Sequence, residues 1–509
     1  MIPQPPAPTT EGAGRAEGAG EVEGAERAEG AERTGRGRGH TLALTSLVTL
    51  IALMNYCAPM LTLPGMTASF GTGLSGQPWL LNGIALGLAA LLLVAGSFAD
   101  DYGRKRVFVG GTAALGVTML LGAVAPSTLT FTLARVAQGA ASAAVLASSL
   151  GLLAHAYPAG PGRVRATGVW GAALSGGIAV GPVVSAGLGV WDWRSGYVLY
   201  AVAALALAAV AARGLTESRG PRRGTPDLLG ALLLGLALTA LLAALTLGRD
   251  GWTRPAVGGL ALAAAVLIAA FGVVERRAQA PLLDLALLRR PAFLLATSGA
   301  LFTGLGMIGM FSYLPALLQG TLGMAELDTA WLMFLWSGVA LTVTLQARRL
   351  TRLTPRHQLV LGFVLAALGA LTMLGALSAG SWARTVPGFV LAGLGSGLLN
   401  AALPRLAVES VPADRVAMGS GANSTARYIG SSIGLSLTVV VATATRGGDS
   451  ARGAAEALAH GADHALYVGA GLLLAGAFVA LVLRERRAAT PAVRPCVRAG
   501  AGSTPTPAA

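Results

Sequence analysis

The densest group of charged side chains in the sequence is GSFADDYGRKR, residues 96–106. Five of these eleven residues are charged, and long apolar runs lie on both sides of them. Carboxylates and basic side chains can pair with one another, or can bind the oppositely charged end of a neighbouring helix. The segment is therefore a candidate gate at the ends of two helices, and Gly96, Asp100, Gly103 and Arg104 are its candidate residues.

A single arginine stands inside another apolar run, LARVAQGAASAAVLASSLGLL, together with Gln138. An arginine within an apolar span is energetically costly, so Arg135 is a functional candidate by default. The alternative is that Arg135, which lies early in its run, extends its side chain to the interface with water.

Polar side chains deep in other apolar runs could bind a small molecule, because a few placed polar groups in an apolar pocket fix a ligand's orientation. The alternative for each is a hydrogen bond between helices or, for the aromatic residues, a place at the membrane interface. The candidates are Asn55, Asn82, Gln319, Asn400 and Asn423, with Tyr313, Trp331 and Trp336 as aromatic walls.

Catalytic and metal-binding patterns are missing from the sequence. The five histidines lie at the ends of apolar runs, between them or in a tail, and none pairs with a carboxylate at helical spacing deep in a run. The two cysteines suggest no disulfide framework. A phosphate-binding G-x-x-x-x-G-K-S/T pattern is also missing, which argues against an ATP-driven pump. We therefore expect no enzyme, no metal and no cofactor.

The composition predicts how these residues are positioned. The chain is 54% hydrophobic and only 12% charged, with a mean hydropathy of +0.65 over 509 residues, which is too apolar for a water-soluble protein. A bilayer-spanning helix needs about 20 apolar residues. We predict an all-α polytopic membrane protein with fourteen spans, at 41–63, 79–99, 107–125, 128–154, 169–190, 196–212, 228–247, 255–274, 292–318, 329–345, 359–378, 386–408, 419–443 and 465–483.

The distribution of basic residues predicts the orientation. With these spans, eighteen arginines and lysines fall in loops on the side of the N-terminus and six in loops on the other side. Basic loop residues concentrate in the cytoplasm, so both termini are expected there. The net charge of +14 is then a consequence of topology. Because the charges are spread over short loops without interleaved aromatic residues, we expect no nucleic-acid partner.

The chain divides into five parts on this prediction. Residues 1–40 repeat a six-residue unit, as in EGAERA and EGAERT, and hold almost no large apolar side chain, so they are expected to be disordered. The remaining parts are a six-helix half at 41–215, a linker with two extra helices at 216–291, a second six-helix half at 292–484, and a disordered tail at 485–509.

Three short motifs carry a resemblance to a known family. Residues 96–106 match the frame G-x-L-A-D-x-x-G-R-R/K except that Phe98 replaces leucine, and Arg135, Gln138 and Gly139 match R-x-x-Q-G. In GGIAVGPVVSAG, the residues Gly177, Gly181 and Pro182 match G-x-x-x-G-P-x-x-G-G, with Ser185 and Ala186 where glycine is common. In this order the motifs resemble those of the major facilitator superfamily. Residues 227–252, 275–293 and 411–437 resemble its fourteen-helix drug:proton antiporter branch.

The resemblance implies a function. It implies a secondary active exporter of a small molecule, such as a drug, an antibiotic or a related metabolite, driven by a proton gradient and embedded in the plasma membrane as a monomer. In this family the position of Arg135 is tied to proton coupling and that of Gly177–Pro182 to antiport. Uptake of a nutrient, transport of a metabolite, and a non-transporting receptor remain alternatives. The excess of Ala, Gly and Arg, with Lys105 as the only lysine, suggests a high-GC bacterium such as an actinobacterium.

One position departs from the family pattern. Its first helix often carries an aspartate about nine residues before a proline, and here Asn55 stands at that position, nine residues before Pro64. A buried carboxylate attracts a cation and can bind a proton, whereas an amide does neither. We therefore expect a neutral or anionic substrate rather than a lipophilic cation.

Overall fold

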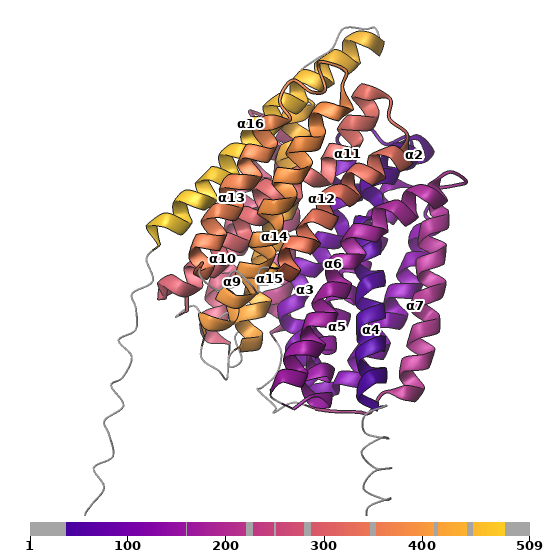
Figure 1. The fold of residues 1–509 in the computed structure, drawn as a ribbon, viewed down its shortest axis with the longest axis vertical. Coiled ribbons are helices and arrows are strands. Elements are labelled where there is room, and N and C mark those ends of the chain that lie inside the picture. Colours follow the sequence, from indigo (N-terminus) through magenta and orange to yellow (C-terminus); the bar gives the residue numbers. More distant parts are fainter. Residues whose placement is uncertain are drawn as a thin grey trace, which may run out of the picture.

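The computed structural model describes residues 37–158, 160–219, 227–248, 251–278, 287–346, 353–411, 416–444 and 451–483. The described residues form helices joined by turns, with no strand among them (Figure 1). Most of residues 1–40 and all of residues 485–509, the predicted disordered tails, lie outside the described residues.

The N-terminal half begins with a broken helix. The first helix, Gly37–Cys57, is interrupted at Ala58 and continues as α2 (Pro59–Phe70). Pro59 cannot donate a backbone hydrogen bond, and Pro64 stands inside α2, which accounts for the irregularity. The half is completed by α3 (Gln77–Tyr102), α4 (Arg104–Ala123), α5 (Thr128–Ala156), α6 (Pro161–Gly189) and α7 (Arg194–Gly214).

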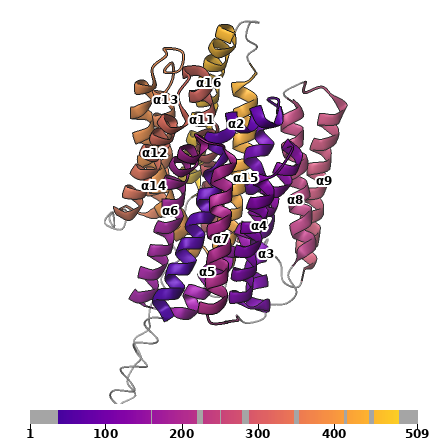
Figure 2. The ribbon, with the colours of Figure 1, turned by 90° about the vertical axis from the view of Figure 1, so that its right-hand side faces the viewer.

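Two helices stand between the halves in the sequence. They are α8 (Leu228–Gly248) and α9 (Pro255–Arg277), which pack against each other. Helix α8 also packs against α3 and α15 (Val416–Ala442), so the pair lies beside the junction of the two halves (Figure 2). Most side chains of α9 are exposed and apolar, as expected for a helix that faces lipid.

The C-terminal half also begins with an irregular helix. Here α10 (Pro291–Phe302) passes through a π-helical segment, η2 (Thr303–Ile308), into α11 (Gly309–Leu322). Single π turns often occur at functional sites. The remaining helices are α12 (Glu326–Gln346), α13 (Pro355–Thr372), α14 (Val386–Glu409), α15 and α16 (Ala451–Val482).

Twelve helices of the described chain are long and apolar enough to cross a bilayer. The predicted spans 79–99 and 359–378 coincide with α3 and α13, which are not among the twelve; within α3, the uninterrupted apolar stretch of described side chains is Gln77–Leu92. Four predicted boundaries differ from the helices by six residues or more: the first span ends with α2 at residue 70 rather than 63, α6 begins at 161 rather than 169, α13 ends at 372 rather than 378, and α16 begins at 451 rather than 465. The residues added to α16 are rich in alanine, the strongest helix former, and they extend α16 beyond its neighbours (Figure 1).

Among the described helices, the halves are joined where α2 packs against α11 and α12, α3 packs against α15, and α6 packs against α12. Within the N-terminal half, α3 and α5 cross at Gly87 and Gly139. A side chain on Gly139 would overlap the carbonyl oxygen of Ile84, and one on Gly87 would overlap that of Val136. The glycine of R-x-x-Q-G therefore brings α5 against α3 and fixes the position of Arg135, one turn earlier.

Candidate functional site

Arg135 is fully buried among neutral acceptors. It has 0% exposure, so its side chain does not extend to the interface with water. Its Nη1 donates to the Asn55 carbonyl oxygen at 2.9 Å, to Asn55 Oδ1 at 3.1 Å and to Gln138 Oε1 at 2.9 Å, and its Nη2 donates to the Tyr56 carbonyl oxygen at 3.2 Å. The ring of Tyr197 lies 5.9 Å from the guanidinium carbon.

The two amides complete this network. Asn55 Nδ2 donates to Gln138 Oε1 at 3.1 Å, and Gln138 Nε2 donates to the Thr118 carbonyl oxygen at 3.0 Å. The network thus joins the first helix, α4 and α5. No carboxylate of the described side chains pairs with Arg135. Asn55, a predicted pocket residue, instead accepts from the buried guanidinium.

The third motif packs directly behind Asn55. A side chain on Gly177 would meet Leu50 and Leu53, and one on Gly181 would meet the backbone of Met54. Pro182 lies inside α6, and the Tyr200 hydroxyl donates to the Gly181 carbonyl oxygen at 3.3 Å. The glycines therefore let α6 pack closely against the part of the first helix whose Asn55 and Tyr56 accept hydrogen bonds from Arg135.

A small polar pocket lies between the two halves. Only about 10 Å³ of it admits the centre of a water molecule, so the pocket has room for about one water. Tyr56 Oη and Ser431 Oγ share a hydrogen bond of 3.2 Å across it. Its lining residues are Tyr56, Met60, Leu81, Asn82, Ser312, Ser431 and Leu435.

Asn82 joins α3 to α15 at this pocket. Its Nδ2 donates to the Ser432 carbonyl oxygen at 3.2 Å and to Ser436 Oγ at 3.0 Å. Its Oδ1 has no hydrogen-bond partner among the described residues, although Asn82 is only 2% exposed. A buried acceptor without a donor is unfavourable, so this oxygen is available to a hydrogen-bond donor that enters the pocket.

Two other predicted pocket residues also join the halves. The Tyr313 hydroxyl donates to Gln77 Oε1 at 2.7 Å, and Gln319 Nε2 donates to the Leu61 carbonyl oxygen at 3.2 Å. Both bonds lie toward the end of the molecule where α3 begins, so they hold the halves together at that end.

The remaining predicted pocket residues lie away from this pocket. Asn423 Nδ2 donates to the Leu403 carbonyl oxygen at 3.3 Å inside the C-terminal half, and Asn400 is half-buried on α14. Trp336 stacks on Phe311 with ring centroids 4.8 Å apart, and Trp331 is exposed on α12. The described contacts of Asn423 and Trp336 thus lie within the C-terminal half.

The gate segment is tied to the end of α7. Gly103 has φ 112°, a left-handed conformation that favours glycine, and it ends α3 just before α4 begins. Glu217 accepts from the backbone amides of Lys105 at 3.0 Å and Arg106 at 3.3 Å, where a carboxylate complements the positive end of the helix. Arg104 Nη1 donates to the Gly151 carbonyl oxygen of α5 at 3.0 Å.

Asp100 and Gly96 are the other two candidate residues of the gate segment. The side chain of Asp100 lies outside the described residues. No described atom lies within 4 Å of a side chain placed on Gly96, so among the described residues no neighbouring helix packs closely on this glycine. Glu217, which the sequence analysis missed, binds the first turn of α4; its signal in the sequence is a single carboxylate directly after a span, in TESRGPRR.

A second missed residue lies near the middle of α15. Arg427 is half-buried within the candidate span Gly419–Ala442, and its guanidinium carbon lies 5.7 Å from the centroid of the Tyr428 ring. The Tyr428 ring in turn lies 5.9 Å from that of Tyr56. An arginine inside a predicted span is the same signal that identified Arg135, and it could have identified Arg427.

Comparison with known proteins decides the family. The sequence model of the Major Facilitator Superfamily matches residues 45–435, which include all three motifs. The chain belongs to the Major Facilitator Superfamily. Its helical architecture agrees: a bacterial homologue of the human lysosomal transporter Spinster, solved in an inward-facing and unoccupied conformation, superposes with a TM-score of 0.64 at 14% identity, covering 88% of this chain and 97% of that chain.

Curated relatives place the chain in the drug-efflux branch. It is 32% identical over 402 residues to multidrug resistance protein Stp of Mycobacterium tuberculosis, covering 78% of this chain and 74% of that protein. It is 30% identical over 455 residues to puromycin resistance protein pur8 of Streptomyces alboniger, covering 86% and 90%. A probable actinorhodin transporter of Streptomyces coelicolor is 32% identical over 399 residues, covering 74% and 67%.

These relatives confirm the family recognised from the motifs. They indicate a multi-pass membrane transporter of small molecules rather than an enzyme. The relatives are actinobacterial, in agreement with the source suggested by the residue usage.

Proposed function

We propose that this protein exports a small molecule across the plasma membrane by alternating access, in exchange for protons. The main support for this proposal is the small polar pocket that lies between the two halves. The chain belongs to the Major Facilitator Superfamily, and its relatives are named for drug and antibiotic resistance. The substrate class follows those names: a drug, an antibiotic or a related metabolite.

The two halves rock about this pocket. Five hydrogen bonds between described residues join the halves, from Tyr56, Asn82, Tyr313 and Gln319, and all lie at the pocket or toward the end where α3 begins. Opening that end breaks these bonds and exposes the pocket to the other side of the membrane. With both termini in the cytoplasm, the joined end is the outer one, and the conformation is inward-facing.

The topology completes the proposal. Helices α3 and α13 join the twelve candidate spans to make fourteen, and the chain works as a monomer. The candidate gate residues of GSFADDYGRKR are Gly96, Asp100, Gly103 and Arg104, and on this topology they lie at the cytoplasmic end of α3 and α4. There Glu217 and Arg104 connect the segment to α7 and α5, so a movement of either helix reaches the gate.

Proton coupling is assigned to the Arg135 network. Arg135 carries a buried positive charge that only neutral groups satisfy, and the backbone of Asn55 and Tyr56 joins it to the pocket wall. A movement of the first helix that breaks these bonds changes the stabilisation of that charge. Without an aspartate at position 55, the proton itself is carried by a carboxylate near a span end or at the gate, such as Asp100.

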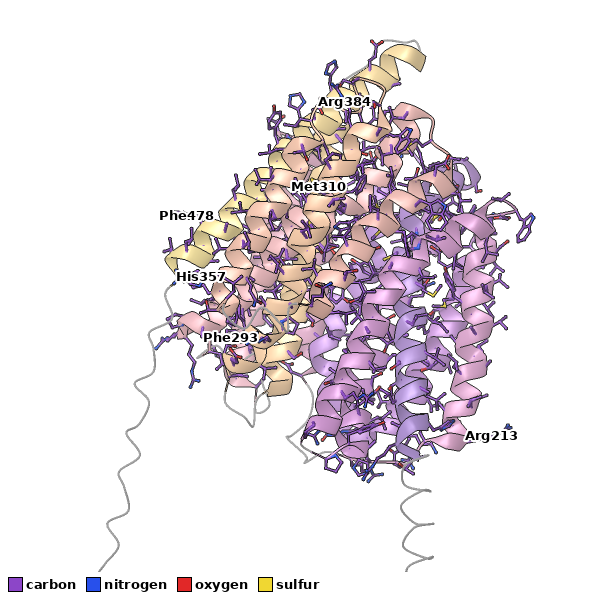
Figure 3. All side chains as sticks on the ribbon, in the orientation of Figure 1. Arg213, Phe293, Met310, His357, Arg384 and Phe478 are labelled. Atoms are coloured by element: carbon purple, nitrogen blue, oxygen red, sulfur yellow. The ribbon has the colours of Figure 1, made fainter. Side chains whose placement is uncertain are left out.

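The proposal is tested by flux in everted membrane vesicles with an imposed proton gradient. A panel including puromycin should show uptake of at least one compound into the vesicles that requires the gradient and stops when a protonophore dissipates it. Arg135→Ala should abolish this flux, while Arg384→Ala, an exposed arginine at the opposite end of the molecule from Arg213 (Figure 3), should leave it unchanged. Flux that persists without the gradient would contradict the antiport mechanism.

A further inference from the structure

Arg427 extends the wall of the pocket by one helical turn. Ser431 and Leu435 line the pocket from α15, and Arg427, Ser431 and Leu435 are spaced four residues apart, so they share one face of the helix. Arg427 therefore lies on the pocket-lining face, on the side toward the beginning of α15.

Arg427 lies on the side of the pocket toward the beginning of α15. The hydrogen bonds described above, which join the two halves, do not reach this side. On α15 these bonds reach Ser431, Ser432 and Ser436, and none reaches a residue before Ser431. Arg427 is half-buried, although it stands near the middle of α15. A guanidinium at this depth that keeps some exposure must face a polar space rather than lipid.

The charge of Arg427 is not matched by a carboxylate in the described part of the chain. The two ion pairs there are Arg106 with Glu217 and Arg194 with Asp192, both near helix ends. The contact of Arg427 is instead with an aromatic ring, that of Tyr428 at 5.7 Å. A planar guanidinium beside an aromatic surface is suited to bind a carboxylate or another oxyanion that is attached to a ring.

The neighbouring groups fit the rest of such a molecule. The ring of Tyr428 lies 5.9 Å from that of Tyr56, which lines the pocket, so both rings can pack against an aromatic ligand that enters beside Tyr56. The unpaired Oδ1 of Asn82, which is buried in the pocket wall, can accept from a hydroxyl or an N–H group. A ligand with an anionic group, an aromatic ring and a hydrogen-bond donor would therefore find a separate protein group for each of these three features.

We propose that the pocket binds an aromatic anion, with Arg427 binding its carboxylate or phenolate, Tyr56 and Tyr428 packing on its ring, and Asn82 accepting a hydrogen bond from it. The proposal rests on the proposed transport function, since it names the substrate class of the same pocket. It also explains the amide at position 55: an aspartate in the first helix would add a negative charge near Tyr56 and oppose binding of an anion.

The experiment uses two dyes that share a xanthene ring but differ in charge. Fluorescein is an anion at pH 8 and rhodamine 123 is a cation. Binding to the purified full-length protein in nanodiscs is measured by fluorescence polarisation. We expect wild type to bind fluorescein more tightly than rhodamine 123, and Arg427→Gln to weaken fluorescein binding by roughly tenfold or more, the effect of losing one charge-assisted hydrogen bond.

Matched variants separate loss of charge from loss of fold. Arg427→Lys keeps the charge and should retain part of the affinity, and Asn82→Ala should weaken fluorescein binding less than Arg427→Gln does. Arg384→Gln removes the same charge from an exposed site at the end of the molecule (Figure 3) and should change nothing. The thermal midpoint of each variant is measured in parallel, so that a misfolded variant is recognised.

The outcomes for the two proposals differ. Fluorescein binding that depends on Arg427 supports the anion site even if proteoliposomes show no gradient-driven flux, a result that would contradict only the transport proposal. Conversely, gradient-driven flux of rhodamine 123 in preference to fluorescein would support transport and overturn the anion site. Failure of wild type to bind fluorescein, or equal binding by a folded Arg427→Gln variant, would also overturn it.

Discussion

The contact between Asn55 and Arg135 can be converted into an ion pair by one substitution. In the N55D variant, a carboxylate would replace the amide oxygen that lies 3.1 Å from Arg135 Nη1. At an effective dielectric constant of about 20, two unit charges at this distance attract by about 5 kcal/mol. Burial of the carboxylate opposes this with several kcal/mol, and loss of the Asn55–Gln138 hydrogen bond removes about 1 kcal/mol. We therefore expect N55D to fold with a thermal stability close to that of wild type.

The second member of the test removes the charge of Arg135. R135Q leaves Asn55 with neutral partners and should be tolerated with a loss of a few kcal/mol at most, about the value of hydrogen bonds to a charged group. The double variant N55D/R135Q leaves a buried carboxylate without a cation, which costs about 3–5 kcal/mol. Its destabilisation should therefore exceed the sum of the two single effects by about 3 kcal/mol or more.

Thermal or denaturant unfolding of the four proteins, purified in the same detergent, measures this interaction energy. A cycle using Asn423→Asp in place of N55D is the control, because Asn423 binds the Leu403 carbonyl oxygen in the other half of the chain. Effects of N55D and R135Q that add within about 0.5 kcal/mol would show that the two side chains do not interact as described.

Four further predictions concern the gate, the topology, the cycle and the substrate. Glu217→Gln weakens the contact with the first turn of α4 and should lower stability by about 0.5–1 kcal/mol, an effect that 1 M salt should reproduce in part in wild type. Epitope tags at residues 20 and 500 should be inaccessible in intact cells and accessible after permeabilisation; labelling of either in intact cells would contradict the fourteen-span topology. Asp100→Asn should slow gradient-driven transport in vesicles without lowering the amount of protein in the membrane, and a wild-type rate would remove Asp100 from the gate. Ethidium should not be transported robustly by wild type, and gradient-driven ethidium transport that Asn55→Ala leaves unchanged would refute the substrate class inferred from position 55.

The sequence motifs predicted which residues matter better than they predicted what those residues contact. Arg135 and Gln138 were recognised from their spacing, but their partners in the first helix and α4 are 79 to 83 and 20 residues away in the chain. Such pairings depend on how helices cross, and one sequence does not contain that information. The amide of Asn55 illustrates this: an asparagine in a span fits a pocket and a structural hydrogen bond equally well.

The helix boundaries show a similar limit. Apolar length predicts where a helix lies in the bilayer, and it located α4, α5 and α8 to within a few residues. It does not predict where a helix continues beyond its most apolar stretch, so the alanine-rich start of α16 was missed. Nor does it predict the break at Ala58 or the π-helical segment η2, because both depend on local backbone geometry.

Tyr56 connects the two parts of the candidate site. Its carbonyl oxygen accepts from Arg135 at 3.2 Å, while its hydroxyl shares a hydrogen bond with Ser431 across the pocket. A movement of the C-terminal half that pulls on Ser431 therefore acts on the same residue that holds the buried guanidinium. The Tyr56 carbonyl group contacts the Arg135 network and the Tyr56 ring lines the pocket. This single residue therefore links the pocket to the network directly, without intermediate residues.

The energies involved are compatible with a transport cycle. Each hydrogen bond between the halves contributes about 0.5–1.5 kcal/mol net, so the five described bonds stabilise this conformation by a few kcal/mol. One charge that crosses a membrane potential of about 100 mV releases about 2.3 kcal/mol. The two quantities have the same order of magnitude. The contacts are thus strong enough to favour the conformation in which the outer end is joined. On the proposed mechanism, they are weak enough for one or two protons, together with the binding of substrate, to open that end.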